Sequence, residues 1–178
     1  GGFVRNFFLK RQSKDIDIVC VGNGIQLAEN VAALLQPSPK VVTYSRYGTA
    51  MFHFNDIEFE FVGARKESYT ADSRKPAVEE GTLEDDQKRR DFTMNALAFS
   101  LNPDEFGLFL DSFEGLEDLN NQIIKTPLDP GITFSDDPLR MMRAVRFAAQ
   151  LGFDIYPETF EALKTEKDRL SYVLGAMN

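Results

Sequence analysis

Two aspartates one residue apart, Asp15 and Asp17, have the type and spacing for metal-ion chemistry. They begin the run DIDIVCV, which alternates and then becomes apolar, as a half-buried strand does. Because successive side chains of a strand point to opposite faces, both carboxylates leave one face while Ile16 and Ile18 enter the other. Neighbouring carboxylates repel unless a cation lies between them, and Mg²⁺ takes such oxygen ligands together with substrate phosphates. The pair predicts a magnesium site, and the alternative is a solvated strand face.

A third carboxylate is usual where two metal ions lie about 3.5–4 Å apart, one at the attacking oxygen and one at the leaving group. In the run IEFEF, Glu58 and Glu60 alternate with apolar residues, so both face the same side of a second strand. Either glutamate could complete the site, with the other only solvating the strand. We predict that Glu60 is the third ligand.

A glycine pair, Gly1 and Gly2, lies ahead of the acidic pair and precedes a segment typical of a helix. A glycine turn that enters a helix N-terminus lets backbone N–H groups approach a phosphate. The sequence therefore predicts a phosphate-binding turn beside the metal site, as a nucleoside triphosphate would need. Because no methionine or strand precedes the glycines, we also expect that the chain has been trimmed.

Composition restricts the kind of site. With one cysteine, Cys20, and one histidine, His53, the chain has neither a disulfide framework nor a zinc site of Cys and His ligands. Any metal must therefore be held by oxygen. The net charge of −8 argues against a nucleic-acid partner, but basic residues are clustered, as at 88–90, and so are acidic ones. A site that holds metal and triphosphate together needs both signs.

The chain has no sequence typical of a membrane or secreted protein. Its apolar share of 43% is ordinary. No run approaches the ~20 apolar residues of a membrane span, and no signal peptide opens the chain. We therefore expect a cytoplasmic protein with no membrane partner.

The elements that must position these residues are read from periodicity and from turn residues. We expect strands at 15–21, 41–54, 57–64 and 106–113, helices at 22–36, 89–99, 137–153 and 158–174, and a short acidic segment at 114–126. Asn55-Asp56 is a hairpin turn signal, and the polar segment 67–86 is expected to be a mobile loop. Mixed strands and helices followed by helices alone predict an α+β domain, then a helical one, with the boundary near Pro127 to Gly131.

Four motifs carry a resemblance to a known family. GGFVR, DIDIV, RRDFTMNALAF and SDDPLRMMRAVRFAAQLGF, in this order and spacing, resemble the class II tRNA nucleotidyltransferases (CCA-adding enzymes) and the bacterial poly(A) polymerases. The resemblance covers roughly the whole chain. It implies a polymerase-β-like nucleotidyltransferase head at 1–128, with a mixed sheet and flanking helices, and the start of an all-helical neck at 129–178.

The resemblance also implies roles for individual residues. Asp15 and Asp17 match the metal-binding, catalytic carboxylates. The residues assigned to nucleotide and phosphate binding are Gly1, Gly2, Arg5, Arg90, Asp91 and Asn95, and those assigned to base recognition are Asp137 and Arg140. Two positions depart from the family pattern: Asn6 stands where an aspartate is usual, and Asp136 where glutamate is common.

Asp137 and Arg140 lie three residues apart at an expected helix start, hence on one face. An ionised aspartate only accepts hydrogen bonds and arginine only donates them. Cytosine and adenine present an amino donor beside a ring-nitrogen acceptor, whereas uracil and guanine present a carbonyl beside an N–H. The pair would therefore accept C and A and reject U and G. In the alternative reading Pro138 begins the helix, Asp137 is its N-cap and Arg140 is a surface residue; in the functional reading Ser135 could cap instead.

Arg90 and Asp91, the ribose-selecting pair of the resemblance, combine a cation suited to a triphosphate with an acid that can accept from ribose hydroxyls. The alternative is a solvated helix start, with Asp91 placed favourably for the helix dipole. Asn95, one turn on, could brace Asp91 or be a polar surface position. Arg143 and Arg146 could meet phosphate or pair with neighbouring acids, and they stay outside the predicted site.

The predicted function is template-independent transfer of CMP and AMP from CTP and ATP to an RNA 3′ end, most specifically CCA addition to tRNA, with two Mg²⁺ ions. Poly(A) synthesis is the runner-up, and CC-adding and A-adding enzymes share the motifs. A rival of another class is a nucleotide- or RNA-binding module without turnover, although such a module has no need of two repelling carboxylates. We expect no DNA partner.

Overall fold

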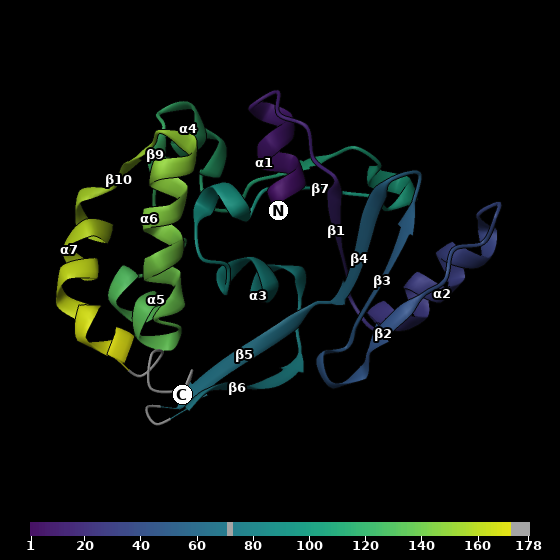
Figure 1. The fold of residues 1–178 in the computed structure, drawn as a ribbon, viewed down its shortest axis with the longest axis horizontal. Coiled ribbons are helices and arrows are strands. Elements are labelled where there is room, and N and C mark those ends of the chain that lie inside the picture. The colour runs from purple at the N-terminus through teal and green to yellow at the C-terminus, as the bar shows by residue number, and fades with distance from the viewer. Residues whose placement is uncertain (71–72, 172–178) are drawn as a thin grey trace. The chain divides into compact units, whose positions relative to one another are not determined.

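The computed structural model describes residues 1–70 and 73–171 (Figure 1). The chain forms two compact units: the first unit is Gly1–Lys66 with Val78–Asp86, and the second is Glu67–Ala77 with Gln87–Asn178. The predicted α+β class, with a mixed sheet and flanking helices, is confirmed. The predicted division into a head at 1–128 and a neck at 129–178 is a different boundary and stays a prediction.

A four-stranded mixed sheet with strand order β1-β4-β3-β2 forms the base of the first unit. Its strands are β1 (Asp15–Cys20), β2 (Val42–Tyr44), β3 (Thr49–Phe54) and β4 (Ile57–Gly63), and its helices are α1 (Gly2–Phe8) and α2 (Gly24–Leu34). β1 runs parallel to β4, whereas β3 is antiparallel to both of its neighbours. The predicted first strand and first long helix are confirmed.

The turn between β3 and β4 lies at Asn55 and Asp56, as predicted. Their φ angles are 50° and 61°, in the left-handed region that these short polar residues tolerate. The strand predicted at 41–54 is instead two strands, because a 3₁₀ turn at Ser45–Tyr47 separates β2 from β3. Gly48 ends that turn with φ 62°, which a side chain would disfavour.

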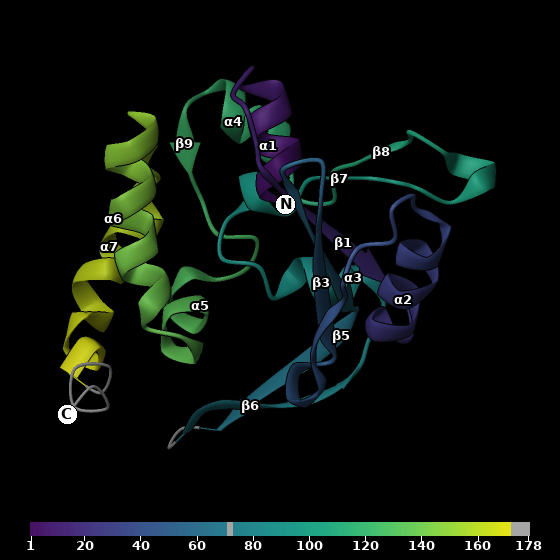
Figure 2. The same ribbon diagram turned by 45° about the vertical axis from the view of Figure 1, so that its right-hand side comes forward.

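Helix α2 covers one face of the sheet (Figure 2). Its buried residues include Ala28 and Ala32, which pack in one cluster with Phe61 of β4. The helix begins close to the sheet, because a Cβ on Gly24 would lie only 2.8 Å from the backbone nitrogen of Gly63. Small residues of α2 therefore allow the helix to lie close to β4.

Cys20 ends β1, in the alternating position of Ile16 and Ile18. It is half-buried, and this burial raises the pKa of its thiol. The thiolate is the reactive form of cysteine, so the residue is less reactive near neutral pH than an exposed cysteine.

The segment 67–86, predicted as a mobile loop, contains regular structure in its described residues, so the prediction of a loop is wrong there; residues 71 and 72 lie outside the described residues. β5 (Arg65–Thr70) and β6 (Ser73–Glu80) form a two-stranded sheet, and α3 (Leu83–Lys88) follows. Hydrophobic alternation marks strands that cover a core on one face, and a two-stranded ribbon does not need that pattern. Thr82 begins α3 through a local exchange: its N–H and hydroxyl donate to Asp85 Oδ2 at 2.9 and 2.8 Å.

The second unit contains short strands and the later helices. Its elements, in chain order, are a 3₁₀ turn at Thr93–Asn95, β7 (Ala98–Phe99), a 3₁₀ turn at Pro103–Glu105, β8 (Phe109–Leu110), α4 (Gly115–Asn120), β9 (Ile123–Ile124), α5 (Pro130–Asp136), α6 (Leu139–Leu151), β10 (Asp154–Ile155), α7 (Pro157–Glu166) and a 3₁₀ turn at Lys167–Arg169. The strand predicted at 106–113 is limited to β8. The helix predicted at 137–153 is confirmed as α6. The helix predicted at 158–174 is confirmed as α7 up to Glu166, and its residues 172–174 lie outside the described residues; α5 was not predicted.

Residues 89–99 were predicted as a helix, and that prediction is wrong. Only Thr93–Asn95 are helical, as a 3₁₀ turn. Every residue from Asp91 to Leu97 is buried, so this segment has no solvent face of the kind an amphipathic helix keeps. Its backbone is fixed instead by residues distant in the sequence: Thr93 N–H donates at 2.9 Å to the carbonyl of Lys125, which follows β9, and Thr93 Oγ1 donates to Asp118 Oδ2 of α4 at 2.7 Å.

Helix α6 is the long element of the second unit. Its inward face carries Arg140, Met141, Ala144 and Phe147, which recur at helical spacing and are buried. Gly152 ends the helix in the left-handed conformation, with φ 73°. Among the helices of the described chain, none combines the length and the apolar content that a membrane span requires.

Candidate active site

The acidic pair lies where the sequence predicts it, on the face of β1 opposite α2. Asp15 and Asp17 are exposed, and Ile16 and Ile18 between and after them are partly buried. Within the described residues, neither carboxylate has a hydrogen bond or an ion pair. Two unneutralised acids two residues apart on one strand face are available to an external cation.

The parallel pairing of β1 with β4 adds two more carboxylates to this face. Asp15 is in register with Glu58, and Asp17 with Glu60. Paired residues of adjacent strands share a face, so the four acids form one acidic surface. His53 of β3 is paired with Glu58, and its Nε2 lies 3.1 Å from Glu58 Oε2.

The two glutamates therefore differ in their surroundings. Glu58 lies beside His53, and Glu60 is in register with Asp17, as the predicted third ligand would be. Over the described residues, no three His, Cys, Asp or Glu side chains are gathered as a ready-made metal-binding group. The role of Glu60 stays a prediction, while two carboxylates with substrate phosphates are a usual Mg²⁺ ligand set.

Gly1 and Asp17 are brought together by helix α1. Gly1 is the N-cap of α1, and a Cβ on it would lie 3.1 Å from Asp17 Oδ2. This close approach explains why the smallest residue suits the position. Its carbonyl accepts from Arg5 N–H at 3.1 Å. The phosphate-binding role of Gly1 and Gly2 stays a prediction.

Arg5, the third predicted phosphate ligand in this unit, is held by Asn6. The Nε and Nη2 groups of Arg5 both donate to Asn6 Oδ1, at 3.1 and 2.9 Å. Asn6 Nδ2 in turn donates to Ser13 Oγ at 3.0 Å. Asn6 thus orients the arginine through a neutral acceptor, at the position where the sequence resemblance led us to expect an aspartate.

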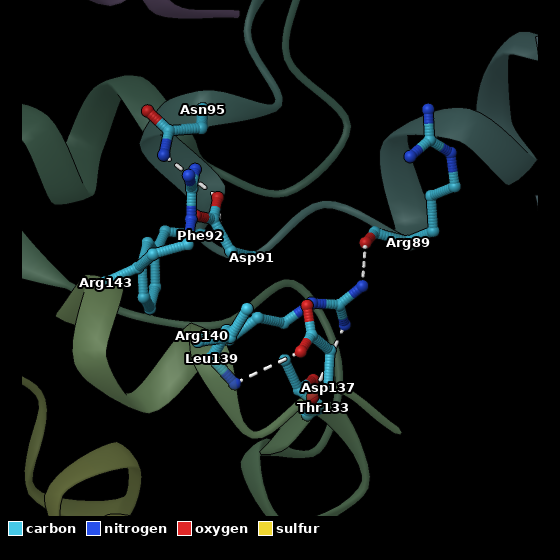
Figure 3. A network of polar contacts seen from close by, with 9 residues as sticks. All are labelled: Arg89, Asp91, Phe92, Asn95, Thr133, Asp137, Leu139, Arg140 and Arg143. Carbon is cyan, nitrogen blue, oxygen red and sulfur yellow. Dashed lines mark hydrogen bonds and ion pairs between the residues drawn. The ribbon is translucent and has the colours of Figure 1, made fainter. Parts of the chain in front are cut away.

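In the second unit, Asp91 is a buried acid at the centre of a network (Figure 3). Its Oδ1 accepts from Phe92 N–H at 2.8 Å and from Asn95 Nδ2 at 2.9 Å. Its Oδ2 accepts from Arg143 Nε at 2.6 Å. The predicted contact of Asn95 with Asp91 is therefore present, and Asp91 does not lie at a solvated helix start.

Arg143, which lies outside the predicted site, is the arginine that contacts Asp91. It comes from α6, 52 residues after Asp91, so no local spacing in the sequence indicates the pair. Arg90, by contrast, was predicted to bind the nucleotide. It is half-buried, and its backbone N–H donates to Gln87 O at 3.2 Å. The nucleotide-binding role of Arg90 stays a prediction.

The base-recognition pair lies in one turn where α5 passes into α6. Arg140 N–H donates to Asp137 O at 3.0 Å, and Asp137 Oδ1 accepts from Leu139 N–H at 3.1 Å. Asp137 therefore accepts from the first N–H of α6, but the N-cap of this helix is Pro138, so neither Asp137 nor Ser135 is its N-cap. Arg140 is buried rather than on the surface as the alternative required, and its guanidinium donates to Arg89 O at 2.8 Å and to Thr133 O at 3.4 Å.

The predicted residues thus form two groups, one in each unit. The group of the first unit is Gly1, Gly2, Arg5, Asp15, Asp17 and Glu60, and the group of the second unit is Arg90, Asp91, Asn95, Asp137 and Arg140. The first group has the exposed acids that metal binding requires. The second has buried polar side chains held in fixed orientations, as selective recognition requires.

The chain is similar to proteins of known function. A family model described as poly A polymerase head domain matches residues 1–125. The A-adding tRNA nucleotidyltransferase of Aquifex aeolicus (strain VF5) is 38% identical over 164 residues, which make up 92% of this chain and 19% of that protein. The CCA-adding enzyme of Bacillus subtilis (strain 168) is 38% identical over 175 residues, which make up 97% of this chain and 42% of that enzyme.

The chain is also similar to a protein of this kind whose structure has been solved. A tRNA nucleotidyltransferase complexed with a primer tRNA and an incoming ATP analog superimposes with a TM-score of 0.81 and 35% identity. The match covers 94% of this chain and 45% of that one. The chain thus spans less than half of the length of each of these three proteins.

Proposed function

This chain belongs to the poly A polymerase head domain family, and from that premise we propose that it is the nucleotidyl-transferring part of an enzyme that adds CMP and AMP to the 3′ end of tRNA. In this reaction the 3′-hydroxyl of the RNA attacks the α-phosphorus of CTP or ATP, and pyrophosphate leaves. The proposed partners are RNA, CTP and ATP, in the cytoplasm.

The observation that carries the proposal is the acidic face of β1 and β4. Asp15 and Asp17 are exposed, without partners in the described chain, and lie in register with Glu58 and Glu60. Keeping such acids side by side costs repulsion, which a bound cation offsets. A protein that only bound RNA would gain nothing from this arrangement, because RNA is itself an anion.

The donor set of this face fits Mg²⁺, a hard cation that takes oxygen ligands and retains sites for phosphates. Asp15 and Asp17 would hold it, and Glu60, beside Asp17, is the proposed third ligand where two ions bind. Bound there, the metal supplies positive charge that aligns the attacking hydroxyl and offsets charge developing on the phosphate. Gly1 and Arg5 are proposed to orient the triphosphate from α1.

Selection of the nucleotide is assigned to the second unit. Arg140 uses two of its five N–H donors on backbone carbonyls, so its guanidinium is fixed while further donors remain for a base. Asp137, one turn away, supplies the acceptor. Together they match the donor and acceptor edge shared by cytosine and adenine, and buried mismatched groups with U or G would stay unpaired.

The relatives include both A-adding and CCA-adding enzymes, and a head that accepts C and A suits either. We favour CCA addition because the Asp137 and Arg140 pair fits both bases; A addition alone and poly(A) synthesis are the alternatives. The full-length protein, given tRNA lacking its last three nucleotides and each labelled nucleoside triphosphate in turn and together, should incorporate CMP first and then one AMP.

The length of the product decides between these candidates. Incorporation of ATP into long runs would favour poly(A) synthesis, and addition only to tRNA that already ends in CC would favour A addition. A binding module without turnover would bind CTP and ATP in magnesium titrations followed by calorimetry, but would extend no RNA. That last result would overturn the proposed function.

A further inference from the structure

Arg143 connects the base-reading helix to the acid proposed to read ribose. Its Nε lies 2.6 Å from Asp91 Oδ2, and Figure 3 shows it reaching that carboxylate from α6. The Asp91 side chain is only 7% exposed, whereas that of Arg143 is 44% exposed. The arginine therefore reaches from a half-exposed position to a buried carboxylate.

The position of Arg143 is fixed on a second side by an aromatic ring. Its guanidinium carbon lies 5.5 Å from the centre of the Phe147 ring, one turn along α6. The Phe147 ring meets the edge of Phe92, the residue after Asp91, with centroids 5.9 Å apart. A planar guanidinium can lie against a ring while donating from its edge, which an ammonium group cannot do in the same geometry.

Asp91 is left with little freedom by these contacts. Its two oxygens accept three hydrogen bonds in the described chain, from Phe92 N–H, Asn95 and Arg143, while a carboxylate has about four acceptor positions. Among the described residues, Arg143 is the one whose contact with Oδ2 is a hydrogen-bonded ion pair. This arginine therefore decides where the remaining acceptor position points.

The same helix holds the backbone of this segment at a second point. Arg140 Nη2 donates to Arg89 O at 2.8 Å, two residues before Asp91. Arg140 and Arg143 are three residues apart and so lie on neighbouring positions of α6. Residues 89–91 are thus attached to α6 by two arginines, of which one is itself part of the base-reading pair.

We propose that Arg143 is a positioning residue that orients the Asp91 carboxylate toward the ribose hydroxyls of the incoming nucleotide, so that sugar selection depends on α6. The inference rests on the proposed function, which makes Asp91 the acceptor for ribose. Loss of the Arg143 contact frees Asp91 Oδ2 to turn away, and the advantage of a 2′-hydroxyl falls.

The test compares Arg143→Lys with Arg146→Lys in the full-length protein. Arg146 is a matched control: it lies on the same helix with its guanidinium 5.1 Å from the Phe147 ring, and it has no contact with Asp91 in the described chain. The readout is the ratio of kcat/KM for CTP to that for dCTP, with tRNA lacking its terminus. Arg143→Lys should lower this ratio about tenfold, and Arg146→Lys should leave it unchanged.

A merely structural role would lower kcat/KM for CTP and dCTP equally, and an unchanged ratio in Arg143→Lys would overturn the inference. Arg143→Gln keeps an uncharged N–H donor, so its ratio of kcat/KM for CTP to that for dCTP should lie between those of Arg143→Lys and the wild-type protein. If the wild-type protein extends no RNA, the proposed function fails, and calorimetry with CTP and dCTP then tests the inference alone. In that case a wild-type preference for CTP that survives in Arg143→Lys contradicts it.

Discussion

The two acidic regions of this protein treat their carboxylates in opposite ways. Asp15 and Asp17 of β1 are exposed and have no partner in the described chain. Asp91 is buried and accepts three hydrogen bonds, one of them from a charged arginine. A carboxylate left open is suited to an external ligand, whereas one that is held in place is suited to recognition by orientation.

This difference has an energetic consequence. The protein does not stabilise the charges of Asp15 and Asp17, so their removal should alter function and not folding. The charge of Asp91 is compensated by Arg143 inside the protein, so its removal should alter both. Activity and free energy of unfolding, measured in the same set of variants, therefore test this difference between the two acidic regions.

The largest effect is expected for Asp15→Asn and Asp17→Asn. Each variant keeps the side-chain shape but removes a charge proposed to hold Mg²⁺, and incorporation of CMP should fall by ~10²–10³-fold or more. The free energy of unfolding, measured in urea, should change by less than about 0.5 kcal/mol, because the side chains are exposed and have no partners among the described residues. Full activity in both variants would remove the acidic face from the mechanism.

Asp91→Asn should lower the free energy of unfolding by about 1.5–3 kcal/mol. The amide nitrogen of the new side chain would meet Arg143 Nε, donor against donor, and the arginine would withdraw to solvent. Urea unfolding of this variant, with Asp15→Asn as its control, measures the contrast directly. Equal free energies of unfolding for the two variants would show that the buried contacts of Asp91 do not stabilise the fold.

Thr93→Val tests whether the segment that carries Asp91 is held by its own buried bonds. The substitution keeps the volume and removes the hydroxyl that donates to Asp118 Oδ2 at 2.7 Å. Because Asp118 is buried, a loss of about 1–2 kcal/mol in unfolding free energy is expected. Asp118→Asn offers the reciprocal control, since its amide can still accept from Thr93 and should cost less.

The smallest effect concerns Cys20, in the alternating position of β1 opposite the acids. Burial raises the pKa of its thiol, so less thiolate is present at pH 8 than for an exposed cysteine. A thiol reagent should label the folded protein at least about fivefold more slowly than the urea-unfolded protein, and the folded rate should rise with pH above 8. Equal rates at pH 8 would contradict the burial of this end of β1.

The sequence predicted features whose physical cause is local. The alternation of DIDIV placed Asp15 and Asp17 on one strand face, and the same period in IEFEF did so for Glu58 and Glu60. The Asn55-Asp56 signal located a tight turn because few residues adopt positive φ. Each of these features depends on residues only a few positions apart, so the sequence pattern alone predicts it.

Features that depend on distant parts of the chain escaped prediction. Residues 91–97 are buried on every side by elements far along the sequence, so their apolar content resembled a helix. The contact of Arg143 with Asp91 joins positions 52 residues apart, and no spacing rule records it. The pairing of β5 with β6 is also absent from the predicted elements, because the polar sequence 67–86 shows no hydrophobic alternation.

The pairing of β1 with β4 also bears on the order in which the protein folds. β3 and β4 are joined by a two-residue turn and close a short loop, whereas Asp15 must find Glu58 across more than forty intervening residues. Contacts distant in sequence are slow to form because the chain entropy lost in closing a long loop is not yet repaid. The β3–β4 hairpin is therefore expected to form early, and the four carboxylates to assemble only when β1 docks, so that their mutual repulsion arises after most of the sheet is in place.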